Sequence, residues 1–236
     1  ENACLDGNLD LVKSLCEKGV DIHSFDDLPF RLACGNGHLE IAKFLLEKGA
    51  YIHACDDHAF RIACENGHIQ IAKFLYERGA DISVLEDYPL RCACQNGHIE
   101  VVKFLIEKGA NDRMAFDIAF DTACSRGHLE VVKLLVSRGA SVKRNIISII
   151  LLFGSHEHFE IIKFLIENGA DESLVSEGAK KYLSFCRKME TKKLISAANK
   201  IGSWWIPICY NLNRECGKRM MERSWKRVEE MYLERN

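Results

Sequence analysis

One unit of thirty residues recurs along most of the chain. Gly-His pairs stand at residues 37–38, 67–68, 97–98 and 127–128. Gly-Ala pairs follow at 49–50, 79–80, 109–110, 139–140 and 169–170, and Ala-Cys pairs occur at 3–4, 33–34, 63–64, 93–94 and 123–124. Self-similarity at a fixed period of about 20–50 residues is typical of proteins built from stacked structural repeats. The period therefore predicts a stack of repeats before any local propensity is considered.

The copy at residues 57–87 indicates what each unit forms. Asp57 precedes the run AFRIACEN and Gly67 follows it, so we expect Asp57 to cap the start of a first helix and Gly67 to close its end. The next run, IQIAKFLYER, is a second helix that ends at Gly79, and four of its residues share one apolar face: Ile71, Ala72, Leu75 and Tyr76. One such pair of helices cannot bury its apolar face alone, but a stacked neighbour can cover it.

These motifs resemble the ankyrin repeat, whose consensus runs Thr-Pro-Leu-His, Ala-Ala, Gly-His, a Val/Leu-rich helix and Gly-Ala-Asp. Here the Ala-Ala pair is Ala-Cys, and Pro29 and Pro89 stand at the Pro position. The resemblance covers about residues 1–174 and implies an all-α solenoid of helix-turn-helix units. The unit is shorter than the usual repeat of about 33 residues, so we expect a compact loop in place of the β-hairpin finger. Short repeats with Asp-Asp before the first helix are similar to those in ankyrin proteins of giant, mimivirus-like viruses that infect amoebae.

The repeats change at both ends of this region. Residues 1–24 begin in the middle of the pattern and without Met, so we expect further residues upstream, further repeats among them. Complete copies are predicted at 25–54, 55–84, 85–114 and 115–144. In the degenerate copy at 145–174, Glu157 replaces the turn glycine, so the turn must change shape or hold a non-glycine residue at positive φ.

Residues 175–236 leave the period and are predicted to form a helical C-terminal cap. The apolar run Ile146–Phe153 is its expected seat. Residues 1–174 carry 18 Lys and Arg against 27 Asp and Glu, whereas residues 175–236 carry 14 against 7. The basic tail therefore complements the acidic repeats. Docking of another protein on the tail and nucleic-acid binding by it are the alternatives, and Glu residues interrupt its basic cluster.

The chain contains eleven cysteines, and the Ala-Cys pairs place one at the same site of each repeat. Stacked helices lie about 8–10 Å apart, whereas a disulfide needs Cα atoms within about 7 Å. We therefore expect free, buried thiols and an intracellular, reducing compartment, which is the host cytoplasm for a viral protein. No apolar stretch approaches the length of a membrane span, so no membrane association is expected.

A Cys-x-x-x-His motif recurs at Cys34/His38, Cys64/His68, Cys94/His98 and Cys124/His128. On one continuous helix these side chains could bind zinc. Because a glycine ends the helix between them, we predict that the Cys lies in the core and the His bonds to backbone in the turn. No metal, cofactor or small-molecule substrate is expected, and no nucleotide-binding, metalloprotease or hydrolase motif occurs. The chain is predicted not to be an enzyme.

Two sets of residues are candidates for partner binding. Arg31, Arg61 and Arg91 recur beside acidic residues, and Asp121 takes the next position. These arginines are interpreted as a charge-assisted network between neighbouring loops or as a site for an acidic ligand. The second set varies between repeats at the loop tips: Phe25, Leu28, Cys55, His58, Leu85, Tyr88, Met114 and Phe116. Its members either anchor a partner or pack between loops.

The resemblance implies binding of another protein through the concave face and the loop tips, without catalysis. A viral origin would make that partner a host protein. The alternative is an adaptor that recruits targets to a ubiquitin ligase through its C-terminal region.

Overall fold

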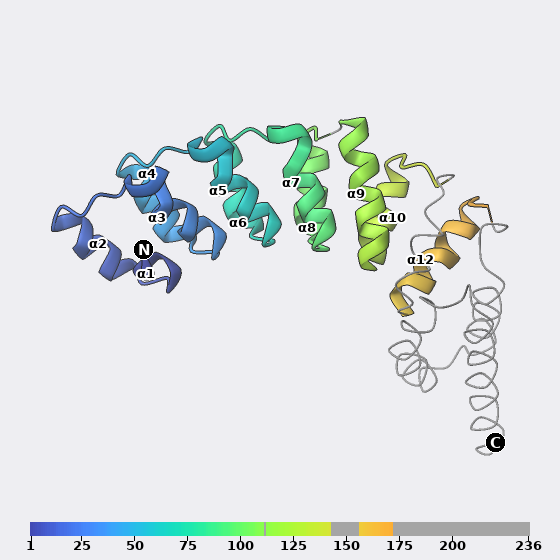
Figure 1. Cartoon of the computed structure of the whole chain (residues 1–236), viewed down its shortest axis with the longest axis horizontal. Coiled ribbons are helices and arrows are strands. Elements are labelled where there is room, and N and C mark those ends of the chain that lie inside the picture. Colours follow the sequence, from blue (N-terminus) through green and yellow to red (C-terminus); the bar gives the residue numbers. More distant parts are fainter. Residues whose placement is uncertain (111, 143–155, 172–236) are drawn as a thin grey trace, which may run out of the picture. The chain divides into compact units, whose positions relative to one another are not determined.

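The computed structural model describes residues 1–110, 112–142 and 156–171, and every regular element within these ranges is an α-helix. The chain divides into two units, Glu1–Ala140 and Ser141–Asn236. The first unit contains five helix pairs: α1 (Asn2–Leu5) and α2 (Leu9–Glu17), α3 (Ser24–Gly35) and α4 (Leu39–Glu47), α5 (Ala54–Glu65) and α6 (Ile69–Glu77), α7 (Val84–Gln95) and α8 (Ile99–Glu107), α9 (Arg113–Arg126) and α10 (Leu129–Ser137) (Figure 1). In the second unit the described helix is α12 (His156–Glu167).

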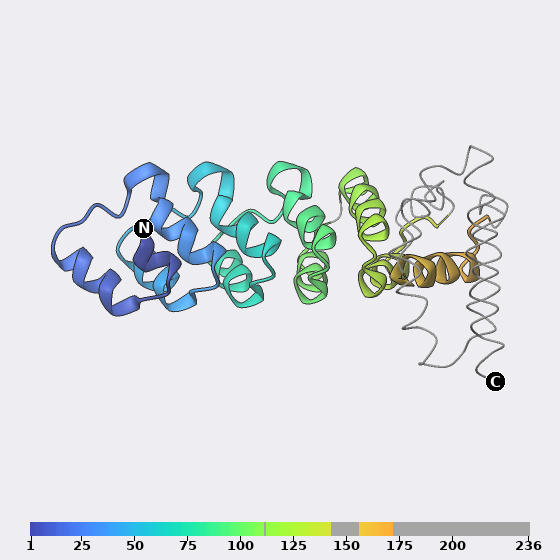
Figure 2. The ribbon, with the colours of Figure 1, turned by 60° about the horizontal axis from the view of Figure 1, so that its bottom comes forward.

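The helix pairs of the first unit stack in two layers. The first helices of successive pairs, α3, α5, α7 and α9, pack side by side, and the second helices α4, α6, α8 and α10 form the other layer (Figure 2). This arrangement confirms the predicted order of helix, tight turn, helix and loop. Within the described ranges no strand is present, and a compact loop replaces the β-hairpin finger, as expected.

The core consists of the same positions in every repeat. On the first helices, Phe30, Phe60, Leu90 and Phe120 are fully buried. On the second helix of the central copy, Ile71, Ala72 and Leu75 are at most 1% exposed, as their spacing predicts. Tyr76 lies at the edge of that face and is half-buried. Burial of each large apolar side chain contributes about 1.5–3 kcal/mol, so the repeated ridge supplies the main stabilisation of the stack.

The Gly-His turns join each repeat to the one before it. Gly67 has φ +79°, which glycine adopts without the strain that a Cβ would add. The Nε2 of His68 donates to the carbonyl of Gly35 at 3.0 Å, and His38 and His128 make the equivalent bond at 2.9 Å. A Cβ on Gly67 would lie 2.5 Å from Nδ1 of His98 in the next repeat. Glycine is therefore required both for its backbone conformation and for the space that the imidazole occupies.

In the degenerate copy, which lacks the turn glycine, the turn has a different structure. Glu157 lies in the first turn of α12, which begins at His156, whereas the position equivalent to the start of α10 is Phe159. The helix therefore extends through the residues that form the turn in other repeats. The predicted helix Ile146–Phe153 and the helical cap over residues 175–236 lie outside the described residues, so the boundary at residue 174 stays a prediction.

Candidate partner-binding surface

Three repeats begin their first helix with three consecutive residues in the left-handed conformation. The φ values are 53° at Phe25, 56° at Asp26 and 56° at Asp27, and residues 55–57 and 85–87 repeat this geometry. Left-handed backbone costs L-residues roughly 1–2 kcal/mol each, so specific bonds must hold these turns. The prediction that Asp57 is an ordinary N-cap is therefore wrong, because Asp57 belongs to the left-handed turn itself.

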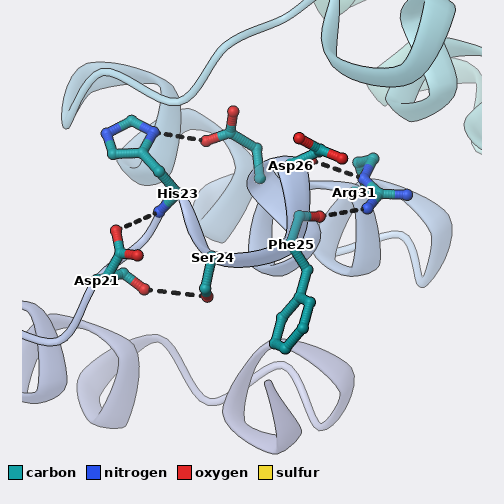
Figure 3. A network of polar contacts seen from close by, with 7 residues as sticks. Asp21, His23, Ser24, Phe25, Asp26 and Arg31 are labelled. Carbon is teal, nitrogen blue, oxygen red and sulfur yellow. Dashed lines mark hydrogen bonds and ion pairs between the residues drawn. The ribbon is translucent and has the colours of Figure 1, made fainter.

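An arginine on the same helix holds each left-handed turn, and Figure 3 shows the first of these turns with Arg31. Arg31 donates from Nε to the carbonyl of Asp26 at 2.9 Å and from Nη2 to the carbonyl of Phe25 at 2.6 Å. Arg61 makes the same two bonds to its own turn, each 2.8 Å long, and Arg91 keeps one bond of 3.2 Å. The predicted charge-assisted network between loops is therefore corrected in its bonds, because the guanidinium groups donate to backbone carbonyls within their own repeat and not to carboxylates of a neighbouring loop.

The third residue of each left-handed turn is a buried carboxylate. Asp27 and Asp57 are 5% exposed, and their Oδ1 atoms lie 2.8 Å from the Nδ1 atoms of His23 and His53. The third repeat has Ser83 at the histidine position. There, Oδ2 of Asp87 accepts a 2.7 Å bond from the backbone N–H of Asp112. Our sequence analysis missed these histidines, although His-x-x-x-Asp recurs at the thirty-residue step.

The fourth repeat lacks both the arginine and the left-handed turn. Asp121 stands at the arginine position, and α9 is helical from Arg113 onward. Its N-cap is Asp112, whose Oδ1 accepts a 2.8 Å bond from the backbone N–H of Ala115. All three repeats with a left-handed turn therefore have the arginine, and the repeat without the turn lacks it. This coincidence supports the arginine as the determinant of the turn.

Tyr88 connects two repeats by lying between two of these arginines. The guanidinium carbons of Arg61 and Arg91 are each 5.4 Å from the centre of its ring. One repeat earlier, His58 occupies the equivalent position near Arg31 and Arg61. Burial, and then these two positive charges, lower the pKa of His58. Neighbouring loops are thus tied together through a ring between guanidinium groups.

The structure divides the predicted loop-tip residues into two groups. Phe25 is 74% exposed, Met114 61% and Leu85 49%, and Cys55 is also exposed. Leu28, His58 and Tyr88, which lie three residues after the first residue of each turn, are half-buried. Phe116 is half-buried as well. The exposed candidates are therefore the first residue of each left-handed turn and, in the fourth repeat, Met114. Whether these residues bind a partner stays a prediction.

The recurring cysteines lie in the core. Cys34, Cys64, Cys94 and Cys124 are fully buried, and burial raises the pKa of each thiol well above its usual range. The histidine of each motif points instead to the turn, where three of the four bond to a backbone carbonyl. This placement confirms that the two side chains have separate structural roles. In the part of the chain that the structure describes, no cluster of His, Cys, Asp and Glu could hold a metal ion.

None of the described helices is both long enough and apolar enough to cross a membrane. No curated protein matches the sequence. The structure is similar to the crystal structure of the human ASB11 ankyrin repeat domain, with a TM-score of 0.62 and 22% sequence identity over 85% of this chain and 96% of that chain. At this identity the likeness concerns the fold. A family model for ankyrin repeats in three copies matches residues 1–86 and 60–146, and the chain therefore belongs to the ankyrin-repeat family.

Proposed function

We propose that this chain is a non-enzymatic scaffold that binds another protein through its left-handed turns and the adjoining face of the first helices. Ankyrin repeats generally mediate protein–protein interactions, and proteins built from them are typically scaffolds without catalytic activity.

One observation carries the proposal: the first residue of each turn is exposed and differs between repeats. Phe25 is 74% exposed although its ring is large and apolar, and Leu85 occupies the same place two repeats later. Stacking leaves the identity of these side chains open, because the core positions are filled by other residues. Exposed aromatic and aliphatic side chains are frequent anchors at protein interfaces.

The turns are also suited to binding because their backbone is already fixed. The arginine fork and the buried carboxylate hold three residues in one conformation before any partner arrives. A surface that is ordered in the free protein loses less conformational entropy on association. The protruding side chains therefore start close to the geometry in which they would bind.

The expected partner is a protein of the cell in which the chain is located. Its buried free thiols favour a reducing, intracellular compartment. The resemblance to repeats of giant viruses supports a protein of the infected host as the partner. Capture from an amoebal lysate is therefore the appropriate first assay.

The test compares the full chain with a double variant, Phe25→Asn with Leu85→Asn. Asparagine tolerates the left-handed conformation, so the change removes apolar surface without adding backbone strain. The matched control is Leu11→Gln with Val20→Gln, which removes two other exposed apolar side chains, 45% and 52% exposed. We expect the captured protein to be lost from the turn variant and retained by the control.

Equal capture by the turn variant and the wild-type chain would contradict the proposed surface. If the proteins captured equally by both were ubiquitin-ligase subunits, the adaptor alternative would be favoured, since that role was assigned to the C-terminal region.

A further inference from the structure

The first two residues of each left-handed turn form a repeated pair, in which the first residue is uncharged and the second is acidic. The pairs are Phe25–Asp26, Cys55–Asp56 and Leu85–Glu86, and all six side chains are exposed. We call these six residues the turn row. The Sγ atom of Cys55 lies 3.9 Å from Oδ2 of Asp26, so the row is continuous from one repeat to the next.

The charges at the turns favour a cationic ligand, although the row of arginines first suggests an acidic one. Each guanidinium group donates to carbonyl oxygens of its own turn, which engages donors that an acidic ligand would need. The second residue of each turn presents an exposed carboxylate, whereas the carboxylate of the third residue is buried. Within the described ranges, no ion pair involves the carboxylates of Asp26, Asp56 or Glu86. The exposed charge along the turn row is therefore negative.

The repeat spacing determines the shape of ligand that fits. Stacked helices lie about 8–10 Å apart. A polyproline II chain has three residues per turn and advances about 3.1 Å per residue, so every third side chain lies on one face and three residues cover about one repeat. An apolar side chain at every third residue would therefore meet Phe25, Cys55 and Leu85 in turn. The row ends at α9, where the left-handed turn is absent, and three repeats correspond to about nine ligand residues.

From this spacing and charge we propose that the turn row binds a segment of the partner protein in the polyproline II conformation, in which an apolar residue recurs every three positions beside Lys or Arg. This inference rests on the proposed function and specifies the chemistry of its ligand. The apolar residues contact the protruding side chains, and the basic residues pair with the adjacent carboxylates. Exposed ion pairs are weak and are screened by salt, so they contribute to selectivity and to the association rate more than to affinity.

The test is selection of random peptides of about twelve residues, displayed on phage, against the full chain, a length that exceeds the roughly nine residues the row can contact. We expect the enriched peptides to be basic and to carry apolar residues at three-residue spacing. The charge variant is Asp26→Asn, Asp56→Asn and Glu86→Gln, in which asparagine keeps the left-handed turn accessible. Its matched control is Glu47→Gln, Glu77→Gln and Glu107→Gln, three exposed carboxylates at the ends of second helices.

The charge variant should bind a selected peptide about tenfold more weakly, since three exposed ion pairs each change affinity by a factor of about 1.5–5. The control should bind it as the wild-type chain does. Enrichment of acidic peptides, or of basic peptides that bind the charge variant equally well, would overturn the inference. So would the absence of enrichment over the Phe25→Asn/Leu85→Asn variant. Lysate capture that depends on Phe25 and Leu85 but not on these carboxylates would leave the proposed function intact while rejecting its cationic ligand.

Discussion

Replacement of Arg61 by Ala tests whether an arginine fork maintains the left-handed turn. The change removes two hydrogen bonds of 2.8 Å to the turn carbonyls and the contact with the Tyr88 ring. A hydrogen bond from a charged donor contributes about 1.5–3 kcal/mol, and a cation–π contact at an exposed site about 0.5–1 kcal/mol. Because the turn is exposed, the lower values apply, and the sum is about 3.5 kcal/mol.

This sum is comparable with the strain that the turn contains. Three left-handed L-residues cost roughly 3–6 kcal/mol relative to ordinary helix, so the turn needs the arginine to remain the preferred conformation. Without it, residues 55–57 can relax toward the regular helix start seen in α9. Relaxation recovers part of the loss, and we expect the free energy of unfolding to fall by about 2 kcal/mol.

The assay has a global and a local part. Urea unfolding followed by circular dichroism gives the change in stability, and hydrogen exchange measured by mass spectrometry reports opening of residues 53–58. Arg61→Lys should recover only part of the loss, because an ammonium group cannot reproduce the two-bonded fork. Arg126→Ala, at an exposed position near the end of α9, is the control and should change stability by less than about 0.5 kcal/mol. Unchanged exchange at 53–58 in Arg61→Ala would refute the reasoning.

Three further predictions concern other parts of the repeat. Gly67→Ala should reduce the free energy of unfolding by about 2–4 kcal/mol in urea titrations, because its Cβ would lie 2.5 Å from a histidine ring; Gly79→Ala, with no atom within 4 Å, should cost only about 1 kcal/mol of backbone strain. The lowered pKa of His58 means that the unfolded chain binds its proton more readily, so stability should decrease as pH falls below about 6.5, and His58→Gln should lessen that decrease. An alkylating reagent at neutral pH should modify exposed Cys55 in the native protein, whereas the five buried Ala-Cys thiols should react only after unfolding, as peptide mass spectrometry can verify.

The sequence was sufficient to predict the stack because its determinants are local and repeated. Gly67 and Gly79 mark turns through their own conformational freedom, and the stripe containing Ile71 and Leu75 marks a buried face. Each of these features depends on residues within one unit of thirty. The helix pairs, the compact loop and the core position of Cys64 could therefore be predicted without coordinates.

The candidate surface was harder to predict from the sequence, because it depends on exceptions to local propensity. Asp57 at a helix start is ordinarily read as a cap, since non-glycine residues seldom adopt three left-handed conformations in succession. The deciding signal is Arg61, four residues later, and its meaning emerges only by comparison with Asp121. The half-buried position of Tyr88 depends on Arg61 in the preceding repeat, a relation that no local pattern indicates.

The histidine bond between repeats bears on how such an array could change in length. His68 reaches back to the carbonyl of Gly35, and His128 makes the same bond to the carbonyl of Gln95, so separate junctions use one set of contacts. Removal of residues 55–84 would bring His98 to the place that His68 now occupies above Gly37, with no new complementarity required. Unequal recombination between units could therefore lengthen or shorten the gene by whole repeats, because each remaining pair of neighbouring repeats would keep the same histidine contact. The exposed turn residues could then diversify independently of the number of repeats.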